Sequence, residues 1–154
     1  KMFQVPEFYD FRITEKWAEK WVSFIVSHII NNYRRPKWDG KKETVQMLGR
    51  WQPWHAGHRA LFERAVAKTG QVAIMVRNCQ GWNDSNPFDF FQVVARIKRD
   101  LEPLYQGQFS IMSVPNIVNI TYGRDVGYKI EQEVFDQSIQ DISATNIRRD
   151  LGLE

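Results

Sequence analysis

The stretch that decides how this chain folds is GRWQPWHAGH, residues 49–58. Its two histidines, His55 and His58, lie three residues apart, with Gly57 between them. The preceding residues 44–48 have the apolar content of a short strand, and residues 57–68 repeat apolar side chains at helical spacing. We therefore expect this stretch to join a strand to the N-terminus of a helix.

Strands and helices are expected to alternate after this connection. Gly70 is placed to end the first helix, and the apolar residues 71–76 predict a second strand, covered on both faces. The other expected elements are a helix at 88–104, strands at 109–114 and 118–122, and short helices at 125–135 and 145–151. The order strand, helix, strand, helix, strand is typical of an α/β fold with a parallel sheet.

Residues 1–43 form a separate N-terminal part in this prediction, and residues 44–154 form the main domain. Thr14 can cap a helix that runs to about Tyr33, in which aromatic and β-branched residues recur at spacings of three and four. The polar residues 34–42 follow, interrupted by Pro36 and Gly40. We therefore predict an N-terminal helical extension with a linker.

The composition is that of an ordinary globular protein. The chain has 154 residues, 43% of them apolar, and a net charge of +3. This charge suits a small phosphate-bearing ligand and does not require nucleic acid. The single cysteine, Cys79, gives neither a disulfide framework nor a zinc site, and no run approaches the roughly 20 apolar residues of a membrane span. We expect a cytoplasmic protein with no nucleic-acid or membrane partner. Both a monomer and a homo-oligomer are compatible with the sequence.

The histidine stretch suits the transfer of a nucleotidyl group. In such a reaction the protein mainly positions the phosphates and stabilises their growing charge. A helix N-terminus offers free N–H groups, Gly57 permits close approach of the backbone, and His55 and His58 can both donate hydrogen bonds to one phosphate chain.

A second phosphate site is expected near the C-terminus, in the sequence ISATNIR at residues 142–148. Ser143 or Thr145 can cap the last helix, and Arg148 lies one turn inside it. Arginine binds phosphate oxygens in a fork geometry, so Arg148 is the candidate for the β- and γ-phosphates.

These stretches resemble signatures of the HxGH nucleotidyltransferase superfamily. Residues 49–58 are similar to G-R-F-x-P-x-H-x-G-H, and residues 142–148 are similar to the late I-S-x-T-x-I-R signature. The N-P-F sequence at residues 86–88 resembles a turn of archaeal-type nicotinamide mononucleotide adenylyltransferases, and the resemblance covers about residues 44–152. The arginine that those enzymes carry five residues after N-P-F is replaced by Val93; Arg96, one turn later, is the nearest substitute.

The resemblance implies a Rossmann-like parallel sheet with helices on both faces, a nucleoside triphosphate donor and Mg²⁺, with no metal-ligating residue assigned. Because the superfamily adds helices after its late signature, we expect the N-terminal helix to cover the surface that those helices would bury. The alternatives are that the chain is truncated or that this surface is buried in an oligomer. The residues implied are catalytic His55, His58 and Arg148; nucleotide-binding Gly49, Arg50, Trp51, Gln52, Gly57, Ser143 and Thr145; and acceptor-binding Gln80, Trp82, Asn86, Arg124 and Asp125.

The first expectation for function is an enzyme that transfers AMP from ATP to a phosphorylated acceptor such as nicotinamide mononucleotide, releasing pyrophosphate. One alternative is a cytidylyltransferase that uses CTP and a polyol, sugar or amino-alcohol phosphate. Two further alternatives are a non-catalytic nucleotide-binding module and one domain of a bifunctional protein.

Overall fold

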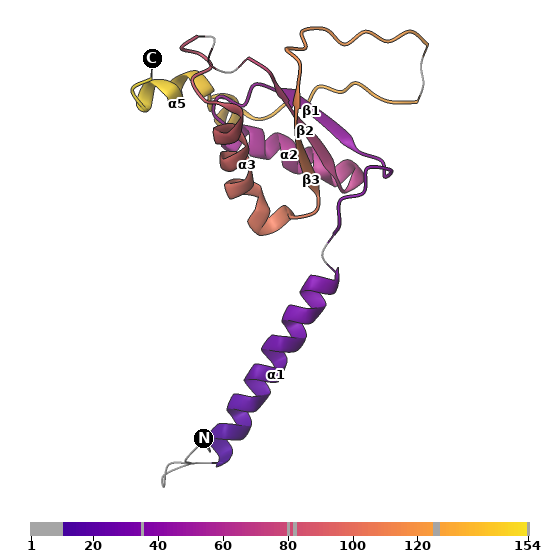
Figure 1. Cartoon of the computed structure of the whole chain (residues 1–154), viewed down its shortest axis with the longest axis vertical. Helices are drawn as coiled ribbons and strands as arrows, with labels where there is room; N and C mark the ends of the chain where they lie inside the picture. Colours follow the sequence, from indigo (N-terminus) through magenta and orange to yellow (C-terminus); the bar gives the residue numbers. More distant parts are fainter. Residues whose placement is uncertain (1–10, 35, 80, 82, 125–126, 154) are drawn as a thin grey trace. The chain divides into compact units, whose positions relative to one another are not determined.

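A computed structural model describes residues 11–34, 36–79, 81, 83–124 and 127–153 (Figure 1). The chain divides into two compact units, Lys1–Arg35 and Pro36–Glu154. The second unit begins earlier than the predicted residue 44, because the segment after Pro36 is hydrogen-bonded to Gln71, which immediately precedes the second strand. The Gln71 amide donates to the Asp39 carbonyl at 2.7 Å and to the Thr44 hydroxyl at 2.6 Å.

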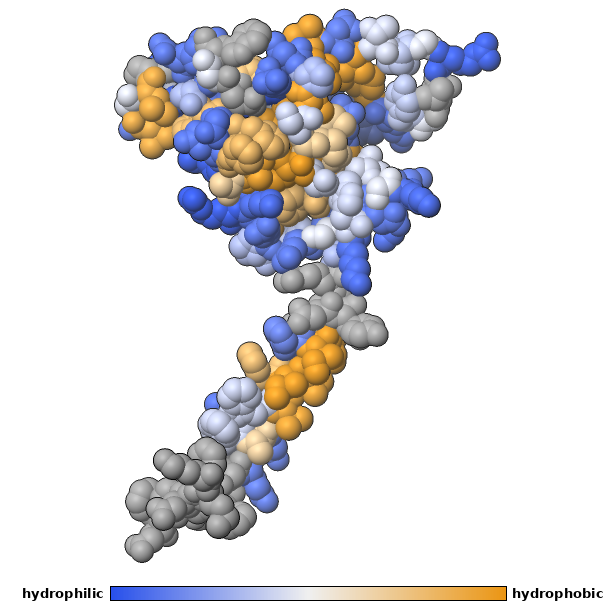
Figure 2. All heavy atoms as spheres, viewed as in Figure 1, coloured by the Kyte–Doolittle hydropathy of each residue, from blue (hydrophilic) through white to orange (hydrophobic). Residues whose placement is uncertain are grey.

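The first unit consists of helix α1 (Phe11–Arg34), close to the predicted 14–33. Its apolar side chains form a continuous stripe along one side in Figure 2. Trp17, Trp21 and Phe24 are 61%, 47% and 65% exposed, and all of residues 15–30 are exposed. That this helix covers a surface of the main domain stays a prediction. None of the helices in the described part of the chain is long and apolar enough to cross a membrane.

The second unit is built on a parallel sheet of three strands in the order β1-β2-β3. The strands are β1 (Val45–Gly49), β2 (Val72–Arg77) and β3 (Phe109–Val114), as predicted to within one residue. Val45 pairs with Val72, which pairs with Phe109, so these side chains share one face with the others that follow at every second position. This face supplies the sheet side of the core.

Helices α2 (Ala56–Thr69) and α3 (Phe90–Tyr105) connect the strands, and both pack on that same face. The Phe62 ring of α2 contacts the Tyr105 ring of α3 with centroids 5.1 Å apart, and Arg59 of α2 pairs with Asp100 of α3. The expectation of helices on both faces is corrected by these contacts. Because the strand order runs in one direction, crossovers of the usual right hand place both helices on one side.

The core lies between the sheet and these helices. Its fully buried members are Phe62, Val72, Ile74, Val76, Val93, Ile97 and Leu101. Sequence signals set the helix ends. Gly70 adopts a left-handed φ of 86° and caps α2 as predicted, while the Asp89 and Gln92 side chains form a capping box at the start of α3.

The chain after β3 departs from the prediction. Residues 115–124 and 127–136 contain no strand or helix, although a fourth strand at 118–122 and a helix at 125–135 were expected. In Figure 1 this segment runs out from the end of β3 and back. Val118, Ile120 and Tyr122 alternate as in a strand, but they are exposed and pair with no strand in the described structure.

The returning arm contacts α2 at every second residue. Glu131 and Glu133 both accept from Lys68, at 2.7 and 2.6 Å, and Phe135 stacks under the Arg64 guanidinium at 4.0 Å. A helix would turn alternate side chains to opposite sides, so this pattern favours the extended form. The short helices α4 (Gln137–Gln140) and α5 (Ala144–Asp150) complete the chain; α4 was not predicted.

Candidate functional site

The histidine stretch joins a strand to the start of a helix, as predicted, and so lies at the carboxyl edge of the parallel sheet. It follows the last residue of β1 and leads into α2, whose N-cap is His55. The strands are parallel, so the loops after β2 and β3 leave the sheet at this same edge. Open α/β sheets bind ligands at this edge, where loop residues from several strands can meet.

Trp51 gives the loop its shape. Its φ of 55° lies in the left-handed region, which is strained for a residue with a large side chain. The ring folds back over Gly49, and its Nε1 donates to the Met75 carbonyl at 3.0 Å. A Cβ on Gly49 would lie 2.7 Å from that ring. The close approach of the Trp51 ring therefore requires glycine at position 49. The Trp51 side chain itself is buried.

Trp54 fixes the start of α2 to α3. The Trp54 side chain is 2% exposed, and its Nε1 donates to the Asp100 carboxylate at 2.8 Å. The same carboxylate accepts from Arg59 at 2.8 Å, and Arg59 also pairs with Glu63 at 2.9 Å. Sequence reasoning missed Asp100; the only available signal was its place on the expected helix at 88–104.

The two imidazoles form a stacked pair on the first turn of α2. Their centroids are 3.6 Å apart with an interplanar angle of 20°. Nδ1 of His55 accepts from the Gly57 N–H at 3.1 Å, and Nδ1 of His58 accepts from the His55 N–H at 3.3 Å, which makes a capping box. Since each Nδ1 is an acceptor, each neutral ring carries its proton on Nε2.

Both rings are neutral at pH 7. Burial lowers the pKa of His58 to about 3, with a smaller contribution from the neighbouring His55. Burial also lowers the pKa of His55, and the positive charge of Arg96 lowers it further. The pair therefore offers two N–H donors to a ligand rather than two positive charges.

Gly57 makes room for the pair. A Cβ at this position would lie 2.9 Å from Cε1 of His55 and 3.1 Å from its Nδ1. Any larger residue would push His55 out of the stack and weaken the cap. The sequence prediction gave Gly57 a role in backbone approach to phosphate; the structure shows a role in housing the His55 ring.

Gln52 connects the histidine loop to two other segments through hydrogen bonds. It is 2% exposed, and its amide exchanges two hydrogen bonds with the backbone of Phe88, each 2.9 Å long. The Gln52 carbonyl in turn accepts from Nη1 of Arg148 at 2.7 Å. Gln52 thus joins three segments that are far apart in the sequence.

Arg148 is the predicted site residue whose position differs most from the expectation. It is 3% exposed, and its guanidinium donates to the Gln52 carbonyl and to the Thr145 hydroxyl. Ser143 is the N-cap of α5, where its hydroxyl accepts from the Asn146 N–H at 3.1 Å. The structure thus brings the second predicted segment against the histidine loop, with the arginine directed into the protein.

Asn86, in the loop after β2, makes side-chain hydrogen bonds to three residues. It is buried, and its side-chain oxygen accepts from Arg50 and from the Cys79 thiol, both at 3.4 Å. Its amide nitrogen donates to Asn83 at 2.9 Å. Asn86 and Arg50 are therefore brought together, in contact through their side chains.

Of the remaining predicted acceptor residues, Arg124 alone is among the described residues. It is exposed, on the segment that follows β3. Gln80, Trp82 and Asp125 lie outside the described residues. The described part of the chain contains no group of three or more His, Cys, Asp or Glu side chains that could hold a metal ion.

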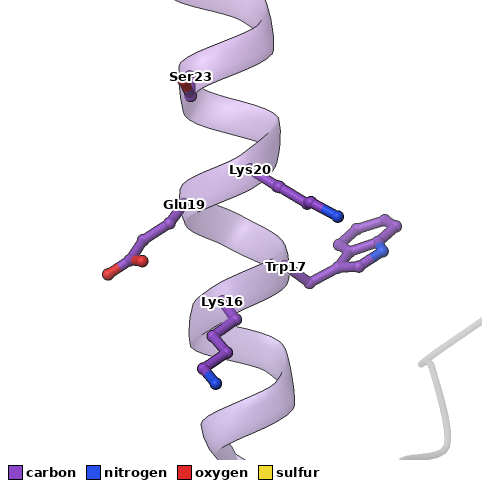
Figure 3. A pocket seen from close by; sticks show the side chains of 5 residues that line it. All are labelled: Lys16, Trp17, Glu19, Lys20 and Ser23. Carbon is purple, nitrogen blue, oxygen red and sulfur yellow. The ribbon is translucent and has the colours of Figure 1, made fainter.

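Two hollows lie on α1, in the first unit. One is lined by Lys16, Trp17, Glu19, Lys20 and Ser23 (Figure 3), and another by Trp17, Lys20, Trp21 and Phe24. In Figure 3, Trp17 and Lys20 project to one side of the helix and Glu19 to the other. These hollows belong to the exposed surface of α1.

No protein-family model and no curated protein matches the chain.

Proposed function

We propose that this protein is a nucleotidyltransferase that transfers a nucleoside monophosphate, most readily AMP from ATP, to a phosphorylated acceptor. The observation that carries the proposal is the stacked pair of neutral imidazoles on the first turn of α2. Two Nε2–H donors next to a helix N-terminus suit a phosphate chain, because the helix dipole favours negative charge there.

In the proposed reaction these residues stabilise charge on the phosphates and form no covalent bond to the substrate. An oxygen of the acceptor phosphate forms a bond to the α-phosphorus, and the bond from that phosphorus to the bridging oxygen of the β-phosphate breaks. Pyrophosphate leaves with the electron pair. Negative charge grows on the α-phosphate oxygens and on the leaving group, where donors from His55 and His58 would stabilise it. Neither histidine needs to transfer a proton, which agrees with their lowered pKa values.

Three observations on the loop support a preorganised site. Trp51 and Trp54 are held by hydrogen bonds to β2 and α3, and Gln52 is braced by Phe88 and Arg148. A loop held in this way keeps donors in place before the ligand arrives, which is where much of the catalytic effect of such sites originates. The three parallel strands are compatible with a Rossmann-like domain, as proposed from the sequence.

Mg²⁺ is part of this proposal as a partner of the triphosphate. This ion is usually held by one or two carboxylates together with substrate phosphates, and it keeps several waters. Its chemistry would be to neutralise charge on the phosphate chain.

Pyrophosphate release tests the proposal. The full chain is incubated with Mg²⁺, a pool of phosphorylated acceptors and each of the four ribonucleoside triphosphates. We expect release with ATP, and nicotinamide mononucleotide is the first single acceptor to test. Release with CTP alone would identify the cytidylyltransferase alternative. No release with any donor would contradict the proposal, and nucleotide binding without release would leave a binding module.

A further inference from the structure

The histidine pair lacks positive charge, although its proposed ligand is highly anionic. The described cations around it are mostly engaged. Arg59 is paired with both Glu63 and Asp100, and Arg148 is buried against the Gln52 carbonyl. A site for a triphosphate is expected to include at least one cation that can reach the phosphate oxygens.

Arg96 of α3 is such a cation. Its Nε donates to the carbonyl of Trp54 at 3.0 Å, and Trp54 immediately precedes His55. The residue is exposed, and none of the ion pairs found among the described residues involves it. The positive charge of Arg96 also lowers the pKa of His55.

The acidic residue one turn further along α3 is already engaged. Asp100 lies four residues after Arg96, at the spacing of a helical ion pair, but its two carboxylate oxygens accept from Trp54 and Arg59. The Trp54 side chain thus binds Asp100 while the Trp54 carbonyl binds Arg96. This arrangement anchors the guanidinium through Nε and leaves Nη1 and Nη2 for a ligand.

We propose that Arg96 is a phosphate-binding residue of this site, which holds the β- and γ-phosphates of the donor through its two Nη groups while Nε stays on the Trp54 carbonyl. This inference rests on the proposed function and names the residue that binds the leaving pyrophosphate. A guanidinium fixed by one nitrogen can present the other two in a fork, which a lysine cannot reproduce.

Binding of inorganic tripolyphosphate tests this assignment without turnover. The variants are R96Q and, as the control, K98Q, which removes the same charge from an exposed residue two positions on, nearly opposite around the helix. We expect R96Q to weaken tripolyphosphate binding about tenfold, K98Q to change it less than about twofold, and R96K to bind nearly as weakly as R96Q. A direct NMR titration should also show the pKa of His55 higher in R96Q and unchanged in K98Q.

The outcomes separate this assignment from the proposed function. Equal binding by R96Q, K98Q and the unaltered protein would overturn the role of Arg96 and leave the nucleotidyltransferase proposal standing. Absence of both tripolyphosphate binding and pyrophosphate release in the unaltered protein would overturn both. Weaker binding by R96Q with an unshifted His55 pKa would also overturn the assignment, because the charge would then act away from the histidine pair.

Discussion

Two helix N-termini, those of α2 and α5, were predicted to do the same work, and the structure builds them differently. At α2, the capping side chains are imidazoles whose Nδ1 atoms satisfy the backbone and whose Nε2–H groups remain as donors. At α5, Ser143 caps the helix and Arg148 points inward to the Gln52 carbonyl. A similar pattern of polar residues thus leaves side-chain donors at one helix, where we propose that a ligand binds, and holds a loop in place at the other.

The largest expected effect concerns the outward donor of His58. H58N keeps an acceptor at the position of Nδ1 and so keeps the cap, but it removes the Nε2–H. H58Q places an amide donor at the position of Nε2. We expect H58N to lower the rate of pyrophosphate release by about 10²- to 10³-fold, and H58Q to lower it much less. The rate is measured at saturating donor, and both variants are checked for folding by thermal unfolding.

This pair of variants can contradict the proposed division of roles. If H58N and H58Q lose activity equally, the position of the donor is not what matters, and the histidine pair would have a structural role like that of Arg148. If both retain full activity, His58 does not belong to the reacting site.

The next effect concerns stability at the other helix. R148M removes the donor to the buried Gln52 carbonyl, so that carbonyl loses its charged partner. We expect a loss of about 2–3 kcal/mol in the free energy of unfolding, measured by urea denaturation. R149M, one residue on and exposed, is the control and should change stability by less than about 0.5 kcal/mol. Equal stability of R148M and the unaltered protein would show that the arginine is held for a ligand and not as a brace.

The third effect is the contribution of His58 to the pH dependence of stability. In the unfolded chain, His58 has a pKa near 6.5, and in the folded protein it is lowered to about 3. Between these values the unfolded chain binds a proton that the folded protein does not, so stability falls as the pH falls. From pH 7 to pH 5 the loss is about 2 kcal/mol, at 1.36 kcal/mol for each pKa unit.

The control for this effect is H58N, which does not titrate. Unfolding is measured at pH 7 and pH 5 for both proteins, and the difference between them isolates His58 from the carboxylates. A difference of zero would mean that the ring is not buried as described, and that protonation of the pair costs nothing in the folded protein.

The sequence predicted the fold near the histidine stretch well. The strands at 44–48, 71–76 and 109–114 were each found to within one residue, because apolar runs between glycines and polar turns mark buried parallel strands. Gly70 as a helix end followed from the same local chemistry. Local signals also placed His55 and His58 together at the start of a helix.

What the sequence did not predict depends on contacts between distant residues. The inward direction of Arg148 follows from a carbonyl 96 residues away, and the engagement of Asp100 follows from Trp54 on another element. A helix was expected at 125–135, but the described residues 127–135 form none, and Lys68 and Arg64 of α2 contact alternate residues there. No spacing within a segment contains this information.

The smallest expected effect separates capping from ligand binding at α5. S143A removes the oxygen that accepts from the Asn146 N–H, and it should lower stability by about 1 kcal/mol, measured by thermal unfolding. S143N keeps a capping oxygen and should lower stability by only a few tenths of a kcal/mol. If Ser143 only caps α5, neither variant should change tripolyphosphate binding. A loss of binding in S143A with unchanged stability would instead give α5 the role that we assign to α2, because a cap whose removal costs no stability would not be needed to hold the helix.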